Sequence, residues 1–291
     1  MDNNLQKYMA FVKTVETGSF TKAAEQLNYA QSSVSKMIAD LEKEWQMILL
    51  ERDRGGVHLT SAGAQILPYA RLLIEDYRKL ESYVDDLHGV QTGMIRIGTF
   101  SSVAINWLPN VIVEFQRDFP GIEYEMLLGD YAEVEQWIEE GRVDCGFLSL
   151  PTRPEFETIS LKMDEYQVVL PQGHPLAAKE RIDIHELENE PFMLLEHGGK
   201  TEVTELLEMY EIHPHIQCTT WEDFSILAMV EKGLGIGILP QMILQRIPYQ
   251  VEIRSLTEPY YREIGLAVKS RERLTSATTK FLEYLDFREK V

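Results

Sequence analysis

The hydrophobic pattern of the chain changes near Met94, and this change constrains the fold more than any other feature of the sequence. Before Met94, apolar residues recur at spacings of three and four, which is the period of amphipathic helices. After it, short apolar runs alternate with helical segments, which is typical of sheets built from βαβ units. The sequence therefore predicts a helical N-terminal part joined to an α/β part, and its 291 residues are too many for one simple core.

The first 60 residues predict three helices followed by a β-hairpin. Helical spacing runs over residues 5–17 and again over 20–27, where Ser19 can cap the second helix. In the third helix, Val34, Ile38 and Leu41 form an apolar face, and small polar side chains lie opposite. The segment ERDRGGVHLT then predicts a two-stranded wing with a glycine turn. The helices alone are also compatible with a plain three-helix bundle, but the wing favours a winged helix-turn-helix over residues 1–60 that binds DNA.

The net charge of −19 argues at first against a DNA ligand, but the charge is unevenly distributed. Residues 1–60 hold seven basic and eight acidic residues, a net charge of −1, which leaves −18 for the rest of the chain. A nearly neutral head can bind phosphates if its cations share one face, while the acidic body discourages nonspecific contact. The total charge therefore does not exclude DNA.

Residues 61–90 predict a linker helix that also dimerises the protein. Its apolar residues step by four and three in alternation, which is the spacing of a coiled-coil seam. An amphipathic helix that packs on its own domain is the alternative. The expected seam residues are Ile66, Ala70, Leu73, Tyr77, Leu80, Val84 and Leu87.

Residues 91–291 predict an α/β domain of two lobes. A βαβαβ series begins at Met94 and a second series begins near Tyr166, so the chain crosses between two bodies of similar size. We expect the first lobe at about 93–162 and 267–291, and the second at about 163–266. The C-terminal ends of the strands then face a cleft suited to a small molecule.

Several segments together resemble one family, the LysR-type transcriptional regulators. The runs GSFTKAAEQLNYAQSSVSKMIADLE and ERDRGGVHLTSAG resemble the family's winged helix-turn-helix. Further along, RIGTFSSVAINWLP, FPGIEYEMLLGD, EGRVDCGF, PQGHPLA and EKGLGIGILP occur in the family's order, so the resemblance covers essentially the whole chain. It implies an α/β multidomain protein with a winged helix-turn-helix, a linker coiled-coil helix and a two-lobed, periplasmic-binding-protein-like effector domain. It also implies a homodimer, or a dimer of dimers, on double-stranded promoter DNA.

The resemblance places the DNA contacts on the third helix and the wing. Three departures bear on them: Ala30 stands where a capping serine is usual, Met37 stands where a polar residue is frequent, and His58 stands where a basic residue is usual. A phosphate contact from His58 would therefore strengthen only when its imidazole is protonated. The expected DNA-binding residues are Lys22, Gln31, Ser32, Ser33, Lys36, Arg52, Arg54 and His58.

The resemblance also implies a ligand site between the two lobes. Two serines follow the first strand at a helix start, and the loop EHGGKT leads to another helix start, where free backbone N–H groups suit an anion. Helix capping and a solvated lysine are the alternatives at these positions. The expected effector is a small anionic metabolite, and the expected contacts are Ser101, Ser102, Ser149, Gly198, Lys200 and Thr201.

Other functions and cofactors find little support in the sequence. A solute-binding receptor, or a sensor without DNA function, would share the two lobes but not residues 1–60. An enzyme would need a catalytic base among the matched cleft positions, and they offer only hydroxyls and one amine. The glycines of GLGIGIL alternate and lead into a strand, and His213 and His215 lack a convincing third ligand, so no nucleotide cofactor or metal is expected. With no apolar run of about 18 residues, we expect a cytoplasmic protein without membrane contact.

Overall fold

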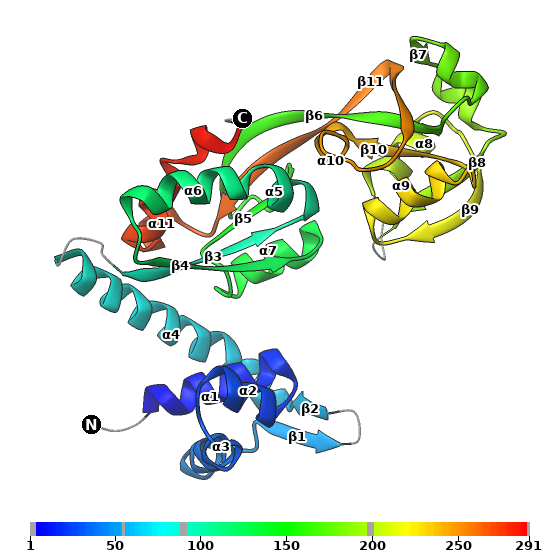
Figure 1. Ribbon diagram of the computed structural model, residues 1–291. Coiled ribbons are helices and arrows are strands. Elements are labelled where there is room, and N and C mark those ends of the chain that lie inside the picture. The colour runs from blue at the N-terminus through cyan, green and yellow to red at the C-terminus, as the bar shows by residue number, and fades with distance from the viewer. Residues whose placement is uncertain (1–3, 54–55, 88–91, 197–200, 290–291) are drawn as a thin grey trace.

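The computed structural model describes residues 4–53, 56–87, 92–196 and 201–289, which form a head, a long helix and a two-lobed α/β body (Figure 1). The expected site residues Arg54, Gly198 and Lys200, and the side chain of Leu87, lie outside the described part. None of the helices in these ranges combines the length and the apolar character that a membrane span requires.

The head contains the three predicted helices and the wing. The helices are α1 (Asn4–Thr17), α2 (Phe20–Gln26) and α3 (Gln31–Trp45), and the strands are β1 (Leu50–Asp53) and β2 (Gly56–Leu59). Val34, Ile38 and Leu41 are buried, as their spacing predicts. They pack with Phe11 and Phe20 into one core, so the opposite side of α3 is left facing outward.

Helix α4 (Ser61–Leu87) leads from the head to the body. Thr60 caps it, because the Thr60 hydroxyl accepts a hydrogen bond of 3.0 Å from the Gly63 N–H. Its first half packs on the head, where Leu67, Ala70 and Ile74 are buried in the head core.

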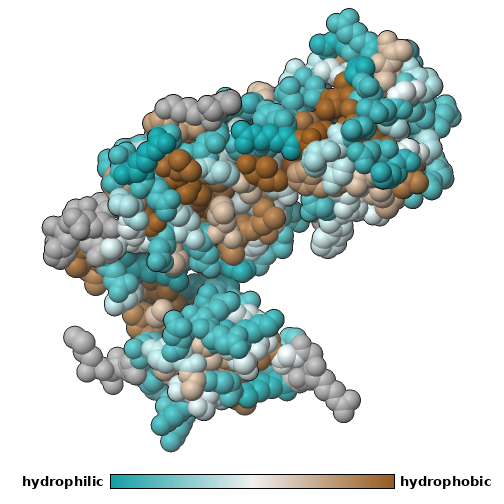
Figure 2. Space-filling view, in the orientation of Figure 1, coloured by the Kyte–Doolittle hydropathy of each residue, from teal (hydrophilic) through white to brown (hydrophobic). Residues whose placement is uncertain are grey.

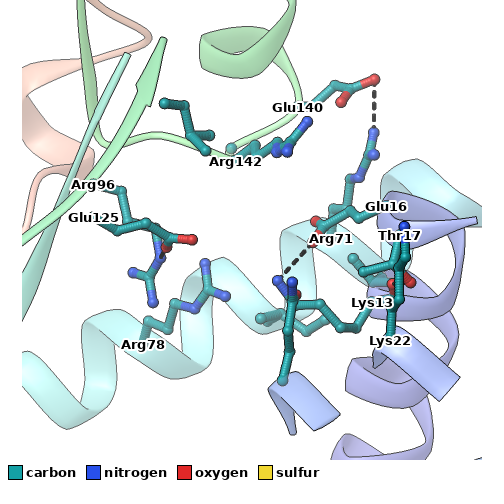
Figure 3. Close-up of a pocket in the computed structure, with 15 residues that line it drawn as sticks. Lys13, Glu16, Thr17, Lys22, Arg71, Arg78, Arg96, Glu125, Glu140 and Arg142 are labelled. Carbon is teal, nitrogen blue, oxygen red and sulfur yellow. Dashed lines mark hydrogen bonds and ion pairs between the residues drawn. The ribbon is translucent and has the colours of Figure 1, made fainter. Parts of the chain in front are cut away.

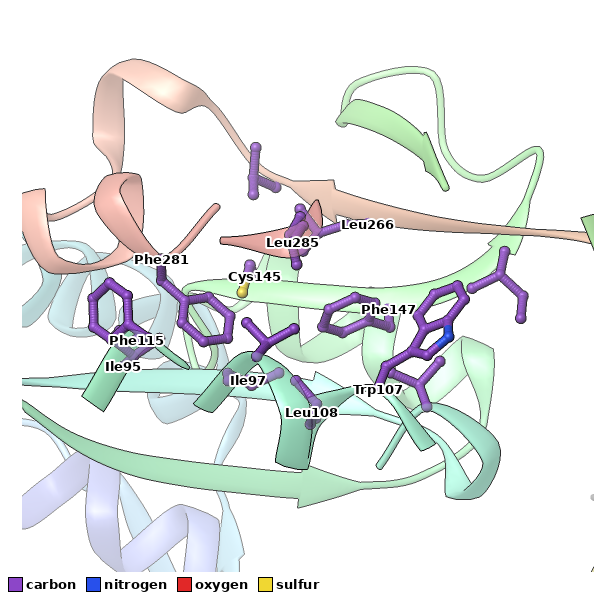
Figure 4. Close-up of a cluster of buried hydrophobic side chains, with 14 of the residues drawn as sticks. Ile95, Ile97, Trp107, Leu108, Phe115, Cys145, Phe147, Leu266, Phe281 and Leu285 are labelled. Carbon is purple, nitrogen blue, oxygen red and sulfur yellow. The ribbon is translucent and has the colours of Figure 1, made fainter. Parts of the chain in front are cut away.

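The first lobe is a parallel sheet covered by helices on both faces. Its own strands, in the order β4-β3-β5, are β3 (Gly93–Thr99), β4 (Ile122–Leu128) and β5 (Cys145–Leu150). The covering helices are α5 (Ser101–Asn106), α6 (Leu108–Asp118), α7 (Tyr131–Glu139), α11 (Ser276–Leu282) and the 3-10 turns η3 (Arg271–Arg273) and η4 (Leu285–Glu289). Figure 4 shows the aromatic core between this sheet and the helices, with Phe115, Phe147 and Phe281 fully buried.

The second lobe repeats this arrangement with its own strands and core. Its parallel strands are β8 (Pro191–Leu195), β9 (His215–Thr220) and β10 (Ile236–Pro240), in the order β10-β8-β9. The remaining elements are α8 (Glu202–Met209), α9 (Asp223–Glu231), α10 (Gln241–Leu244), the short strand β7 (Arg181–Ile182) and the 3-10 turns η1 (Pro175–Ala178) and η2 (Ile184–Leu187). Both series of strands and helices predicted from the sequence are therefore present.

Two long antiparallel strands connect the lobes, and the sequence pattern indicates only one end of each. Strand β6 (Glu157–Pro171) carries the chain into the second lobe, and β11 (Val251–Val268) carries it back (Figure 1). Residues 263–267 of β11 pair with β5, whereas residues 166–169 of β6 pair with β10. The expected lobe boundaries therefore fall inside continuous strands.

Candidate functional sites

The outward edge of α3 presents a row of polar side chains. Gln31, Ser32 and Lys36 are exposed and Ser33 is half-buried, while the buried stripe of α3 holds them in place. Ala30 precedes the helix and makes no side-chain cap, because an alanine side chain has no hydrogen-bond acceptor. The first N–H groups of α3 thus remain available at the end that a recognition helix turns toward base edges.

Arg52 connects the wing to both helices of the helix-turn-helix. Its Nη2 donates to the Ser35 Oγ of α3 at 3.0 Å, and its guanidinium carbon lies 3.7 Å from the centre of the Phe20 ring of α2. His58 is exposed on β2, opposite Glu51 of β1. Arg52 therefore fixes the wing against α3 while remaining at the surface.

Lys22 lies apart from this surface. It lines a cavity between the head and the first lobe, together with Arg71 of α4 and Arg96 of β3, and no residue of α3 lines that cavity. The DNA contact expected of Lys22 stays a prediction, since Lys22 is exposed. The position depends on how the head docks against the body, which helical spacing does not reveal.

The expected seam of α4 divides between two environments. Leu73, Tyr77, Leu80 and Val84 are exposed by 51%, 41%, 60% and 47%, so this part of the stripe has no partner within the described chain. Hydrophobic surface is visible along α4 between the head and the body (Figure 2). Ala70, by contrast, is only 3% exposed and packs in the head core, with Ile66 partly buried against it. The first turns of α4 must cover the head, so Ala70 is not part of the free face.

A cleft of about 390 Å³ lies between the two lobes. The first lobe contributes the starts of α5 and α7, the second contributes the starts of α8 and α9, and the crossing strands contribute Tyr166 and Arg262. Phe100, Tyr131, Tyr166 and Trp221 provide aromatic walls. The volume and the lining of this cleft are those of a binding site for a small molecule.

Arg262 organises the floor of the cleft. Its Nε and Nη2 donate to Asp164 Oδ2 at 3.0 and 2.7 Å, its Nη2 donates to Ser102 Oγ at 2.8 Å, and its Nη1 donates to the Tyr131 hydroxyl at 2.9 Å. Asp164 also accepts a hydrogen bond from the Met242 N–H at 3.0 Å. Both charges are buried, so they are stable only as a pair. The pair joins both crossing strands to α5 and α7 of the first lobe.

Tyr131 faces both an arginine and a carboxylate. Burial is the main cause that raises the pKa of the Tyr131 phenol; Arg262 lowers this pKa and the nearby Glu202 raises it. The hydroxyl is therefore neutral at physiological pH and can donate a hydrogen bond while it accepts one from Arg262.

Four of the cleft residues expected from the sequence are described, and three of them line the cleft. Helix α5 begins at Ser101, and Ser101 lines the cleft. Ser102 also lines it, but the Ser102 hydroxyl is buried and engaged by Arg262. Thr201 lines the cleft and caps α8 by accepting from the Thr204 N–H at 3.3 Å. Ser149 pairs with Ile264 in the sheet and does not line the cleft, so this expectation is wrong.

The residues missed by the sequence are those of the crossing strands and the aromatic walls. Asp164 and Arg262 each have a charged neighbour, Glu165 and Glu263, so nothing local in the sequence marks either of them as half of a buried pair. Glu202 was missed because helix-start acids are common. Its Oε1 is buried at the cleft and has no hydrogen-bond partner among the described residues.

Comparisons with known proteins cover both parts of the chain. Residues 5–64 match the family model for the bacterial regulatory helix-turn-helix protein of the lysR family, and residues 88–288 match the LysR substrate binding domain. YvbU from Bacillus subtilis (strain 168), named an uncharacterized HTH-type transcriptional regulator, is 35% identical over 276 residues, which is 94% of each chain.

Solved structures share the fold over nearly the full length. A full-length OxyR variant from Pseudomonas aeruginosa matches with a TM-score of 0.74 at 22% identity, over 98% of this chain and 97% of its own. Full-length CbnR in complex with its target DNA matches with a TM-score of 0.68 at 19% identity, over 97% of this chain and 98% of its own. The head, the linker helix and the two lobes thus occur together in solved regulators. This chain belongs to the LysR family of helix-turn-helix transcriptional regulators, which bind promoter DNA and small-molecule effectors and are not enzymes.

Proposed function

We propose that this regulator reads its promoter with Gln31, Ser32, Ser33 and Lys36 of α3 and contacts phosphates with Arg52, Arg54 and His58 of the wing. The observation that carries this assignment is the polar outer edge of α3, held against the head core by a buried stripe. Amide and hydroxyl groups suit base edges in the major groove, and the cations suit the phosphates beside it. A role at promoter DNA supports a cytoplasmic location.

We also propose that the effector carries an anionic group and a hydrogen-bond donor. The hydrogen bonds of Arg262 use four of the five N–H groups of a guanidinium, which leaves one on Nη1 for a ligand oxygen. Ser101 and the first N–H groups of α5 lie at the same side of the cleft. Glu202 shares a hydrogen bond with the Tyr131 hydroxyl, and its Oε1, which has no partner among the described residues, would accept a second hydrogen bond from a ligand hydroxyl or ammonium group. A small hydroxy or amino acid has both groups; Gly198 and Lys200 stay predictions as further contacts.

Regulation then follows from the position of the cleft between the lobes. A ligand that touches α5 and α8 together stabilises one angle between the lobes, because its affinity differs between arrangements. The two crossing strands are the connections that must bend. Arg71 of α4 pairs with Glu140 of the first lobe at 2.9 Å, so a movement of that lobe reaches the linker helix.

The exposed apolar face of α4 supports a homodimer, which can pair again into a dimer of dimers. Leu73, Tyr77, Leu80 and Val84 repeat at spacings of four and three and would be covered by the same face of a second chain. Pairing of two heads raises the affinity for two adjacent DNA half-sites without new contacts.

The effector assignment is tested with a Glu202→Gln variant and a panel of small carboxylic, hydroxy and amino acids. A compound that raises the melting temperature of the unaltered protein should also change its affinity for a promoter fragment in a gel shift. Its dissociation constant should rise about tenfold in Glu202→Gln, because a charged acceptor is replaced by a neutral amide.

Glu205→Gln is the matched control, since Glu205 is exposed on the same helix and does not line the cleft. It should bind the compound as the unaltered protein does. Equal binding by both variants would remove Glu202 from the site. A stabilising compound that leaves promoter affinity unchanged would contradict the coupling of the cleft to DNA.

A further inference from the structure

A second cavity, of about 370 Å³, lies where the head, α4 and the first lobe meet (Figure 3). Helices α1 and α2 supply its head side, α4 supplies one wall, and β3, β4 and the turn after α7 supply the side of the first lobe. Among the described residues, none lines both this cavity and the effector cleft. Anything bound there contacts three separate parts of the chain.

The cavity is strongly cationic although the chain as a whole carries a charge of −19. Its three acidic residues each pair with a cation: Glu16 with Lys13 at 2.8 Å, Glu125 with Arg96 at 3.2 Å, and Glu140 with Arg71 at 2.9 Å. The cations left without an ion pair among the described residues are Lys22, Arg78 and Arg142. The lining therefore keeps an excess of three positive charges, contributed by the head, by α4 and by the first lobe.

Arg78 has the least favourable surroundings of these cations. Burial lowers the pKa of Arg78 most and the positive charge of Arg96 lowers it further, against the opposing effects of Asp144, Glu16 and Glu125. Its guanidinium donates no hydrogen bond to any of the described residues. The buried Nε of Arg71, on the same helix, also has no hydrogen-bond partner there. A half-buried cation and a buried N–H group without partners cost free energy that an anion would recover.

We propose that this cavity binds a small polyanion bearing phosphate groups, and that the bound ligand fixes the head against the first lobe. An excess of three positive charges calls for at least two negative charges on the ligand, and guanidinium groups bind phosphate oxygens with two parallel hydrogen bonds. The volume suits a phosphorylated metabolite or an inorganic polyphosphate and excludes a DNA duplex.

The ligand acts on the orientation of the head. Because Lys22 and Lys13 belong to the head and Arg96 and Arg142 to the body, only the docked arrangement brings all of them to one anion. A polyanion therefore favours this arrangement over any other in which the head has moved. The promoter contacts would then respond to two ligands, one between the two lobes and one between the head and the first lobe.

The test is isothermal titration of the full chain with inorganic pyrophosphate, with chloride at equal ionic strength as the screening control. Pyrophosphate should bind saturably with one site per chain, and chloride should not. Arg78→Gln should weaken binding about tenfold or more, because it removes a charge-assisted contact. Arg142→Gln, which alters the body side, should weaken it in the same direction.

Arg117→Gln is the matched control, since Arg117 is 65% exposed on α6 and lies outside the cavity. It also loses one positive charge and should bind pyrophosphate as the unaltered protein does, and Glu202→Gln in the effector cleft should do the same. Equal weakening by Arg117→Gln would indicate nonspecific charge attraction and overturn the proposal. So would an absence of saturable binding, or weakening by Glu202→Gln, which would move the anion to the cleft.

Discussion

Replacement of Arg262 by methionine should lower the free energy of unfolding of the effector body by about 3–5 kcal/mol, which is the usual cost of breaking one buried ion pair. Asp164 would remain fully buried with its carboxylate opposite an apolar side chain, and Ser102 and Tyr131 would each lose a hydrogen bond. Denaturant unfolding followed by tryptophan fluorescence measures this loss, because three of the four tryptophans, Trp107, Trp137 and Trp221, belong to the body.

Removal of both charges is the control for this prediction. In Arg262→Met combined with Asp164→Leu, no unpaired carboxylate remains, so much of the lost stability should return. The double variant should still fail to respond to an effector, since the floor of the cleft has lost its guanidinium. A single variant that unfolds at the same denaturant concentration as the unaltered protein would show that the pair does not hold the lobes together.

Gln31→Ala combined with Lys36→Ala should weaken binding to a promoter fragment about 100-fold. Each specific base contact contributes about 1–3 kcal/mol, and the loss is repeated in both heads of the proposed dimer. Loss of the Lys36 charge should also make the affinity less sensitive to salt, because one phosphate contact per head is missing. Fluorescence anisotropy at several salt concentrations measures both effects.

Lys232→Ala is the charge-matched control, because Lys232 is exposed in the second lobe, far along the chain from the head. It should leave both the affinity and the salt dependence unchanged. If the α3 variant kept the affinity and salt dependence of the unaltered protein, its outer edge would not be the surface that contacts DNA.

The sequence predicts most of the fold because the signals for its elements are local. The stripe of Val34, Ile38 and Leu41 repeats at helical spacing within one element, and the apolar runs of the α/β part mark its strands in the same way. Such a pattern is encoded by residues that are close together in the sequence, so it can be detected without knowledge of tertiary contacts. The winged head, the linker helix and both α/β series follow from them.

The sites depend on contacts between distant segments, and these are where the sequence pattern is insufficient. Arg262 of β11 pairs with Asp164 of β6. Both residues lie outside the apolar runs of their strands, where polar and apolar residues do not alternate clearly. Lys22 faces Arg71 and Arg96 because the head docks on the body, a geometry that no local spacing encodes. Ala70 fits a coiled-coil seam by its position, yet the head covers it, so only packing distinguishes the two uses of α4.

The proposed function requires two paired heads on promoter DNA. Hydroxyl-radical footprinting on the DNA adjacent to its own coding region tests this most directly, with a Leu73→Glu and Leu80→Glu double variant in parallel. The unaltered protein should protect two half-sites on one face of the duplex, spaced by about 10 base pairs or a multiple of it. The variant, which places two carboxylates on the exposed face of α4, should lose the paired protection. A single protected segment with the unaltered protein, or an unchanged paired footprint with the variant, would contradict the account.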